Sequence, residues 1–458
     1  MTNVIKWVLA MSMSSRSALP PGPRLPAAAQ FAGFWTRPLA YLERCRRRYG
    51  RRFTIRLPAT PPFVMLSDPD EVKEVFTAPP DVLRPGQGAR VLEPLVGSNS
   101  VLLLDEGAHM AQRKLMLPAF HGERMERLTG LMEEVTAAEV TALPRGVPVP
   151  LHPRMQELTL KIILRAVFGI EPGARFDALC ERLQAMLAFG DRPISLVPPK
   201  PESRIAKVAE RVGPFAQFVR TQEEVDRIIF ELIAERRAEG VEGDDVLAML
   251  LEARHEDGAP MSDQEIRDEL LTLLIAGHET TATSLAWAFE RLVRERAVLD
   301  RLVEEIDNGE DAYVTATIQE TLRARPVLPN VAPRLVAKPI EVGGWAYPPG
   351  CSLVANGYLI HHDADIYPDP YAFRPERFLG QSPGTYTWIP FGGGRRRCIG
   401  ASFAMLEMTV VLRALLGACT LSAAADGVEV AQRRNITVRP IAGARAVLAD
   451  RAATPVAA

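Results

Sequence analysis

Residues 391–400 read Phe-Gly-Gly-Gly-Arg-Arg-Arg-Cys-Ile-Gly, and this glycine-rich stretch decides how the rest of the chain is interpreted. After Cys398, apolar residues recur at helical spacing, at Phe403, Leu406, Val410 and Ala414. The thiol therefore stands where a helix begins and backbone amides lack partners, a position that favours a thiolate. Because Gly392, Gly393 and Gly394 have no Cβ, we expect close backbone folding that directs N–H groups at the sulfur.

A thiolate in such a loop is a candidate metal ligand. One cysteine supplies only one ligand, and no second Cys or His stands nearby at zinc spacing. The metal would have to bring its other ligands with it, as haem does. The residues by themselves leave open a second interpretation, an inert cysteine buried in front of a core helix.

The loop contains more than a lone cysteine. Phe391, Gly394, Arg396, Cys398 and Gly400 form the pattern F-x-x-G-x-R-x-C-x-G. This pattern resembles the haem-binding loop of the cytochrome P450 (haem-thiolate monooxygenase) family, in its soluble bacterial type. The resemblance implies a mainly α fold with small β-sheets, haem b as the cofactor, and Cys398 as the iron ligand. It also implies that the other four residues shape the loop around the haem, with Arg396 facing a propionate.

The composition is that of a globular protein. The chain has 458 residues, 47% of them apolar and 24% charged, with a formal net charge of −2. This charge provides no general attraction to nucleic acid or to an anionic membrane. Five scattered cysteines, an odd number, argue against a disulfide framework and for a reducing compartment, and we expect the cytoplasm.

The chain shows no linker, so we expect one catalytic domain over residues 19–450. Residues 1–18 are expected to be a leader and 451–458 a loose tail. The apolar part of the leader, Val4 to Met13, is shorter than the roughly 20 residues of a membrane-spanning helix, so no transmembrane anchor is expected, although shallow interfacial binding stays open. The proline-rich segment Leu19 to Pro26 must be extended.

Periodicity predicts the main elements. Helices are expected at 38–49, after Asp68-Pro69, repeatedly between 123 and 257, and at 262–296; strands at 53–57 and 63–66; and hairpins at 331–350 and 428–441. Residues 77–104 show no period and are expected to form a long ordered loop. Residues 187–207 are also irregular, and the resemblance implies that they form a mobile lid.

The helix at 262–296 carries an unusual centre. Ser262 and Glu265 form a capping box. Small and polar residues then interrupt the apolar run at Ala276-Gly277-His278-Glu279-Thr280-Thr281, which predicts a distorted turn with a groove. The alternative is a kinked helix that only packs. The stretch resembles the family's A-G-x-[DE]-T-[TS] signature, which implies that Ala276 and Gly277 border the haem, Thr280 donates to dioxygen and Glu279 relays protons, while His278 is a bystander.

Further site residues follow from the resemblance at positions that are weak by themselves. His109 and Arg113, four apart on one helix face, and Arg334 and His361 would contact the propionates. Glu320 and Arg323 form E-x-x-R and would join Arg377 behind the cysteine loop, in a structural role. The expected substrate-lining residues are apolar: Val91, Leu92, Ile275, Val327, Leu328, Val331 and Ala332.

The resemblance implies a monooxygenase that inserts one oxygen atom from O2 into an apolar substrate such as a fatty acid, terpenoid, steroid or polyketide-like compound. No nucleotide-binding fingerprint is present, so NAD(P)H would act only through a ferredoxin or flavodoxin and its reductase. Arg395, Arg397 and the arginines of residues 44–52 are expected to form the docking face. We expect a monomer. Two alternatives stay open, a peroxide-driven hydroxylase or isomerase on the same fold and a haem-thiolate sensor.

Overall fold

The computed structural model describes residues 19–120, 123–196, 213–240 and 243–451. The expected leader at 1–18, most of the tail and part of the expected lid lie outside these ranges. The helices of the described residues are α2 (Ala27–Thr36), α3 (Pro38–Tyr49), α4 (Pro69–Thr77), α5 (Pro85–Gly88), α6 (Glu93–Val96), α7 (Glu106–Met116), α8 (Glu123–Ala142), α9 (Leu151–Phe168), α10 (Ala174–Leu187), α12 (Pro214–Glu239), α13 (Val246–Glu252), α14 (Asp263–Leu292), α15 (Arg296–Asp307), α16 (Ala312–Ala324), α17 (Gly357–His361) and α18 (Ala401–Ala418).

The strands form four small sheets. The largest has the order β1-β2-β8-β5-β3, in which only the β2–β8 pair is parallel, and a second has the order β4-β12-β9. Two hairpins, β6–β7 and β10–β11, complete the set. Their bounds are β1 (Arg52–Ile55), β2 (Phe63–Leu66), β3 (Leu83–Arg84), β4 (Pro148–Pro150), β5 (Arg334–Val336), β6 (Ile340–Val342), β7 (Trp345–Tyr347), β8 (Ser352–Ala355), β9 (Cys419–Ala423), β10 (Ala431–Arg434), β11 (Thr437–Pro440) and β12 (Arg445–Asp450).

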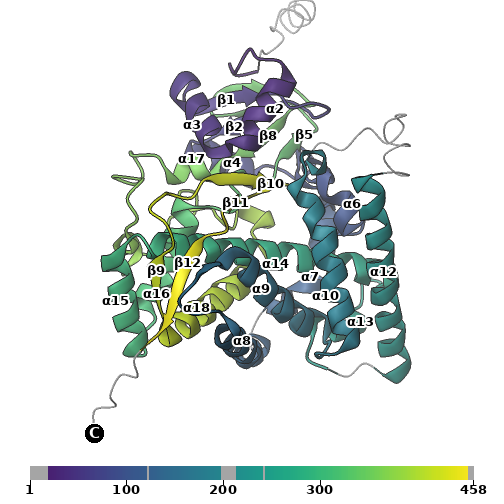
Figure 1. Ribbon diagram of the computed structural model, residues 1–458. Helices are drawn as coiled ribbons and strands as arrows, with labels where there is room; N and C mark the ends of the chain where they lie inside the picture. Colours follow the sequence, from purple (N-terminus) through teal and green to yellow (C-terminus); the bar gives the residue numbers. More distant parts are fainter. Residues whose placement is uncertain (1–18, 121–122, 197–212, 241–242, 452–458) are drawn as a thin grey trace, which may run out of the picture.

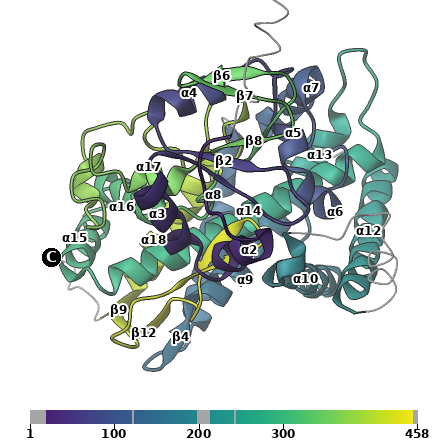
Figure 2. The ribbon, with the colours of Figure 1, turned by 90° about the horizontal axis from the view of Figure 1, so that it is seen from above.

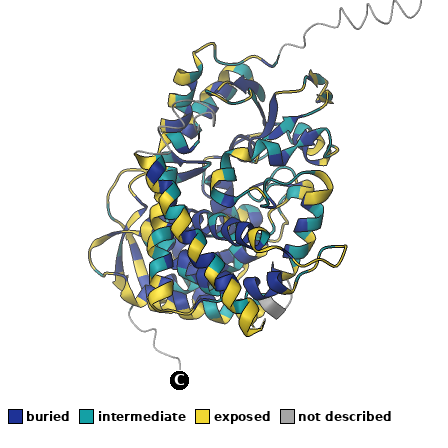
Figure 3. Cartoon of the chain, turned by 90° about the vertical axis from the view of Figure 1, so that its right-hand side faces the viewer, coloured by how far each residue is buried: buried dark blue, intermediate teal, exposed yellow. Residues whose placement is uncertain are grey.

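α14 is the element around which the others are arranged (Figure 1). It runs across the middle of the molecule, with the five-stranded sheet on one side and α18 and α8 on the other. The predicted capping box is present: Glu265 N donates to Ser262 Oγ at 3.2 Å, and Ser262 N donates to Glu265 Oε2 at 2.8 Å. Most of its residues are buried, and the exposed residues of the molecule gather on the outer helices and loops (Figure 3).

The predicted fold class, mainly α with small sheets, is confirmed, and several elements begin where the sequence indicates. Asp68 caps α4 through Asp70 N at 3.0 Å, with Pro69 in the first turn. The proline-rich segment is extended and is fixed by Thr54, whose hydroxyl donates to Pro20 O at 2.7 Å. Residues 77–104 differ from the prediction, because they contain β3, α5, α6 and a 3-10 turn at Arg90–Leu92 instead of one loop.

The expected hairpin at 331–350 is also more complex. Its second half is the β6–β7 hairpin, which turns at Gly343 and Gly344 with φ of 55° and 71°. Its first half, β5, pairs with β8 and β3 in the large sheet. Among the described residues, one helix, α18, is long and apolar enough to cross a membrane, but half of it is buried against the rest of the protein, as is typical of a core helix.

Candidate functional site

The cysteine loop lies between a 3-10 turn at Gly394–Arg396 and the start of α18. Cys398 N donates to Phe391 O at 2.9 Å, which closes the loop. The amide directed at the sulfur belongs to Gly400, the N-cap of α18. The prediction that Gly392, Gly393 and Gly394 supply this amide is therefore wrong.

The glycines have another role, which is to fit the loop against α4. A Cβ on Gly393 would lie 2.4 Å from the Phe76 ring, and one on Gly394 would lie 2.4 Å from Phe76 O. Gly392 and Gly394 also have φ of 68° and 62°, the left-handed region in which a side chain is disfavoured. Only glycine permits both the backbone conformation and the close approach.

Cys398 is accessible to solvent, although many atoms of neighbouring elements surround its thiol. Burial among the surrounding elements raises the pKa of the Cys398 thiol, while the Gly400 amide, Arg113 and Arg397 favour the thiolate and oppose that rise. These three groups therefore make the thiolate of Cys398 less unfavourable, but they do not offset the effect of burial. A coordinated metal ion would complete the deprotonation.

Four basic side chains form one group at this loop, and one of them, Arg396, belongs to the loop itself. Arg396 is held by residues 101–105: it pairs with Asp105 at 3.0 Å and donates to the carbonyls of Val101 and Leu104. His109, Arg113 and Arg334 complete the group, and electrostatic coupling links Arg396 to each of them.

These side chains fit a dianionic cofactor. Within the described chain, the guanidinium groups of Arg113 and Arg334 make no ion pair or hydrogen bond, and Arg334 lies over the Phe76 ring, 5.0 Å from its centroid. Burial lowers the pKa of Arg334 to about 10, and burial with Arg396 and Arg113 lowers the pKa of His109 to about 3. Buried cations require anionic partners. Two propionates beside a thiolate ligand would satisfy this donor set, so the residues fit haem.

His361 is held by residues other than the four basic side chains. Its Nε2 accepts from Ile389 N at 3.0 Å and its carbonyl accepts from Arg323 Nη1 at 2.7 Å. Burial and Arg323 lower the pKa of His361 to about 3, so the ring is neutral. These contacts give His361 a structural role behind the loop, and its Nδ1 has no hydrogen-bond partner among the described residues, so the expected propionate contact stays a prediction.

The centre of α14 has a polar exposed face in a buried helix. Ala276 is exposed and Gly277 and Thr280 are half-buried, whereas most other residues of the helix are buried. A small exposed residue in the middle of a central helix indicates that this face borders an internal space. The predicted distortion is absent from α14, which is helical throughout Asp263–Leu292.

Close packing explains Gly277 without a distortion. A Cβ there would lie 2.9 Å from Ile163 Cδ1 of α9. The Thr280 hydroxyl donates to Ala276 O at 2.6 Å, along the helix. In this geometry the lone pairs of Thr280 Oγ1 are free to accept a hydrogen bond from a ligand. To donate to a ligand, the hydroxyl must rotate away from Ala276 O.

Glu279 points away from this face, toward α9 and the β10–β11 hairpin. Its Oε2 accepts from Arg434 Nη1 at 2.7 Å and from Gln156 Nε2 at 2.8 Å, and its Oε1 accepts from Thr283 Oγ1 at 3.3 Å. Sequence reasoning missed these partners, since Arg434 lies 155 residues away in the chain. His278, the expected bystander, hydrogen-bonds Thr159 at 2.9 Å.

The expected substrate-lining residues are spread over three segments. Val91, in the turn before α6, contributes to a small cavity of about 20 Å³ with Phe189, Phe215 and Phe218, whose rings pack together. Val331 lies at the cysteine loop, 3.5 Å from where a Gly392 Cβ would be. Val327 is buried and its carbonyl accepts from Val438 N. The others are half-buried or exposed: Leu92, Ile275, Leu328 and Ala332.

Glu320, Arg323 and Arg377 come together behind the loop. Arg323 makes a bidentate pair with Glu320 at 2.7 and 2.8 Å, and both side chains are 0% exposed. Arg377 Nε lies 3.6 Å from Glu320. Arg323 also donates to the carbonyls of His361, Pro370 and Ala372. This cluster holds residues 361–377 in place.

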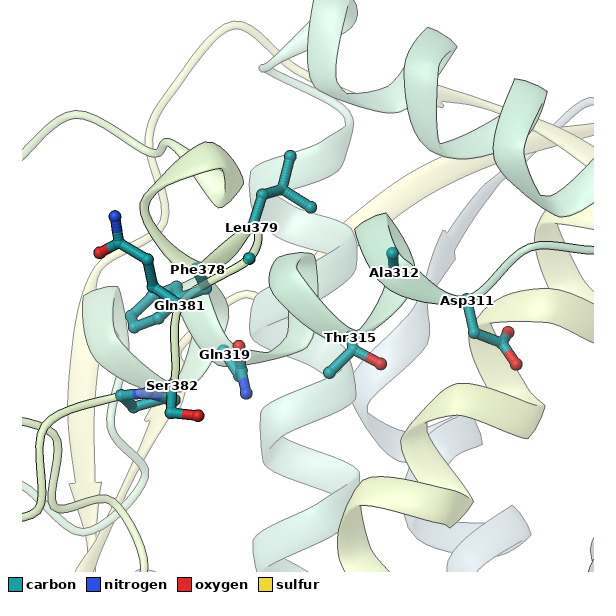
Figure 4. A pocket seen from close by; sticks show the side chains of 10 residues that line it. Asp311, Ala312, Thr315, Gln319, Phe378, Leu379, Gln381 and Ser382 are labelled. Atoms are coloured by element: carbon teal, nitrogen blue, oxygen red, sulfur yellow. The ribbon is translucent and has the colours of Figure 1, made fainter.

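A separate surface groove of about 480 Å³ lies between the start of α16 and residues 378–383 (Figure 4). Its polar side chains are hydroxyls, amides and the carboxylate of Asp311, which pairs with Arg413. These groups do not form a nucleophile–base pair or a metal cluster within the described residues. We therefore place the functional site at the cysteine loop and α14.

Comparison with known proteins agrees with this site. The family model for cytochrome P450 matches residues 18–444. The putative cytochrome P450 135B1 of Mycobacterium tuberculosis is 38% identical over 444 residues, which cover 95% of this chain and 92% of that protein. The putative cytochrome P450 138 of the same organism is 39% identical over 435 residues, which cover 94% of this chain and 97% of that protein.

Solved structures show the same fold. A retinoic acid-bound cyanobacterial CYP120A1 has a TM-score of 0.81 at 22% identity, covering 95% of this chain and 100% of that one. The haem domain of cytochrome P450DA has a TM-score of 0.82 at 23% identity, covering 95% and 98%. With its thiol loop, its cationic group and its central helix arranged as described, this chain belongs to the cytochrome P450 family.

Proposed function

We propose that this cytochrome P450 monooxygenase inserts one atom of O2 into an apolar small molecule, with haem b bound through Cys398. The main support is the cysteine loop with three arginines beside it, of which Arg113 and Arg334 have no ionic partner within the described chain. Haem bound through a thiolate supplies oxygen activation. The protein supplies position, polarity and protons.

We assign two proton-handling roles to α14. The Thr280 hydroxyl, on the half-buried face beside Ala276, would donate a hydrogen bond to dioxygen. Glu279, one residue earlier on a buried face, would return protons to the site. Proton delivery by positioned side chains is worth about 10²–10⁴ in rate.

The substrate is expected to be apolar. Val91, Leu92, Ile275 and Leu328 are aliphatic, and three phenylalanines adjoin Val91. Such a lining favours fatty acids, terpenoids, steroids or polyketide-like compounds over charged metabolites.

Electrons would come from a ferredoxin or flavodoxin that docks on the cysteine-loop side. Arg395 and Arg397 are exposed and have no ionic partner among the residues described. The expected contribution of residues 44–52 is smaller, because Arg46 and Arg51 pair with Asp363 at 2.6 and 2.8 Å and Arg52 pairs with Glu71. The exposed residues of that cluster are Arg44, Arg47 and Arg48.

The first experiment is the carbon monoxide spectrum of the reduced protein, before and after Cys398→Ser. A red-shifted band that the substitution removes supports thiolate ligation, and a band that survives it overturns the proposal. Spectral titration with a panel of the four substrate classes then identifies the ligand. Product from added peroxide but none from O2 with reductant and redox partners would favour the peroxide-driven alternative. Absence of any apolar ligand would favour a sensor.

Charge reversal tests the docking face. Arg395→Glu with Arg397→Glu should slow reduction by a ferredoxin, with a loss that shrinks at high salt. Reversal of Arg47 and Arg48 on α3 should slow reduction less, because the arginines of residues 44–52 are expected to contribute less to the docking face. An unchanged rate in the first variant would place the docking face elsewhere.

A further inference from the structure

A chain of hydrogen bonds leaves Glu279 on the side away from the cysteine loop. Thr283, one turn further along α14, donates to Glu279 Oε1 at 3.3 Å. The same hydroxyl lies 3.1 Å from Nε2 of His152, the second residue of α9. All three side chains are buried.

Among the described residues, Thr283 is the neighbour of Glu279 that can pass a proton. Arg434 binds the carboxylate at 2.7 Å, but a guanidinium does not release its proton in proteins. Gln156 donates from an amide, which is not a general acid. A hydroxyl can accept one proton while it gives up another.

The geometry fixes which atom donates in each hydrogen bond between His152, Thr283 and Glu279. A carboxylate accepts only, so the Thr283 proton points at Glu279. The hydroxyl must then accept from His152 Nε2, which makes His152 the Nε2–H tautomer with Nδ1 as an acceptor. Burial, with Arg434, Arg439 and His278, lowers the pKa of His152 to about 3 and keeps the ring neutral. This assignment rests on the hydrogen-bond network.

His152, the outer end of this series of hydrogen bonds, lies close to the surface. His152 itself is 1% exposed and its N donates to buried Gly443 O at 2.9 Å, but Pro150, two residues before it, and Ile441, two residues before Gly443, are exposed. The strand before His152, β4, pairs with β12 at the edge of the molecule (Figure 2). Nδ1 of His152 has no hydrogen-bond partner among the described residues.

We propose that Glu279 regains its proton from solvent through His152 and Thr283, a route that rests on the proposed oxygen-activating function. A water proton binds Nδ1 while the Nε2 proton moves to Thr283 Oγ1 and the Thr283 proton moves to Glu279 Oε1. One proton enters and one arrives, and the imidazole is left as the Nδ1–H tautomer. The resting tautomer returns when the Nδ1 proton leaves to water and Nε2 takes a proton from water, after rotation of the side chain brings that nitrogen to solvent.

Two substitutions interrupt the route and one serves as a control. Thr283→Val removes the hydroxyl, and His152→Gln keeps an amide N–H near the Nε2 position without a proton to pass. Thr159→Val removes the hydroxyl that bonds His278, a second buried Thr–His pair between the same two helices. It has no bond to the Glu279 carboxylate.

In the holoenzyme with O2, reductant and redox partners, the first two variants should form product about tenfold more slowly, release more hydrogen peroxide per electron pair and show a larger solvent isotope effect. Thr159→Val should match the wild type, and substrate-binding spectra should be unchanged in all three. Equal coupling in all four proteins would overturn the proposal. A wild type that makes product only from added peroxide would overturn the proposed function instead.

The tautomer is a readout that does not need turnover. Nitrogen-15 NMR of the reduced, carbon monoxide-bound protein, with His152→Gln to assign the signal, should show Nε2 protonated and Nδ1 not. Thr283→Val should shift the Nε2 signal and Thr159→Val should not. A resting Nδ1–H tautomer would overturn the route.

Discussion

Arg434 of β10 and Glu279 of α14 form a buried ion pair at 2.7 Å, with side chains that are 8% and 11% exposed. Arg434 also pairs with Asp191 at 3.3 Å and donates to Leu187 O at 3.1 Å. The pair therefore joins the expected proton donor to the end of α10 and the residues after it.

The first prediction concerns this pair. Arg434→Leu leaves a buried carboxylate without its cation and should lower the free energy of unfolding by about 3–5 kcal/mol. The double variant with Glu279→Gln should recover much of that loss, because neither charge is then buried alone. Denaturant unfolding of the two single variants and the double variant measures the coupling, and additive losses would show that the pair does not interact.

The second prediction concerns Glu320 and Arg323. Their bidentate pair is fully buried, so Arg323→Leu should cost about 3–5 kcal/mol and reduce haem retention, since residues 361–377 lose their anchor. Asp300→Asn is the matched control, because it removes the partner of Arg296 on an exposed helix face, where a pair is worth less than about 1 kcal/mol. Similar losses in the two variants would contradict the anchoring role.

The third prediction separates backbone strain from contact at Gly394. Gly394→Ala should be destabilised both by its φ of 62° and by the approach of its Cβ to Phe76 O. Gly350→Ala shares a positive φ, 91°, but its Cβ would meet nothing within 4 Å, so it should lose only about 1–2 kcal/mol. Thermal unfolding of both variants gives the difference. Equal losses would remove the contact with α4 from the explanation.

The fourth prediction concerns acid. Burial lowers the pKa of His278 to about 3, below the ordinary value of 6.5. The unfolded chain then binds the extra proton, so stability is present above pH 6.5 and is lost as the pH falls toward 3, by about 1.4 kcal/mol per pH unit for this residue. His278→Gln should flatten the dependence of unfolding free energy on pH by that slope between pH 6 and 4. An unchanged slope would mean that His278 is protonated in the folded protein.

Local patterns predicted the elements that local interactions determine. The capping box at Ser262 placed the start of α14, and Asp68-Pro69 placed the start of α4. The roles of the cysteine loop and of the E-x-x-R pair came from the family resemblance, because their spacing alone left other interpretations open. The fold class came from the family resemblance, and the repeated helical periodicity agrees with it.

The remaining errors come from contacts between distant segments. No local pattern shows that Gly393 and Gly394 fit against Phe76, that Gly277 faces Ile163, or that Arg434 reaches Glu279. His152 and Gln156, four residues apart on one helix face, were a signal for a polar contact that sequence reasoning did not use.

The position of Arg434 late in the chain has a consequence for biosynthesis. Glu279 and its helix leave the ribosome long before β10 does. Another 155 residues must be synthesised before the Arg434 guanidinium can pair with the Glu279 carboxylate. Trp287 of the same helix donates its indole N–H to Val438 O in the next strand, β11. The packing around α14 is thus completed only when the final segment is synthesised, and a nascent chain arrested before residue 434 carries the Glu279 carboxylate without the arginine that pairs with it in the finished protein.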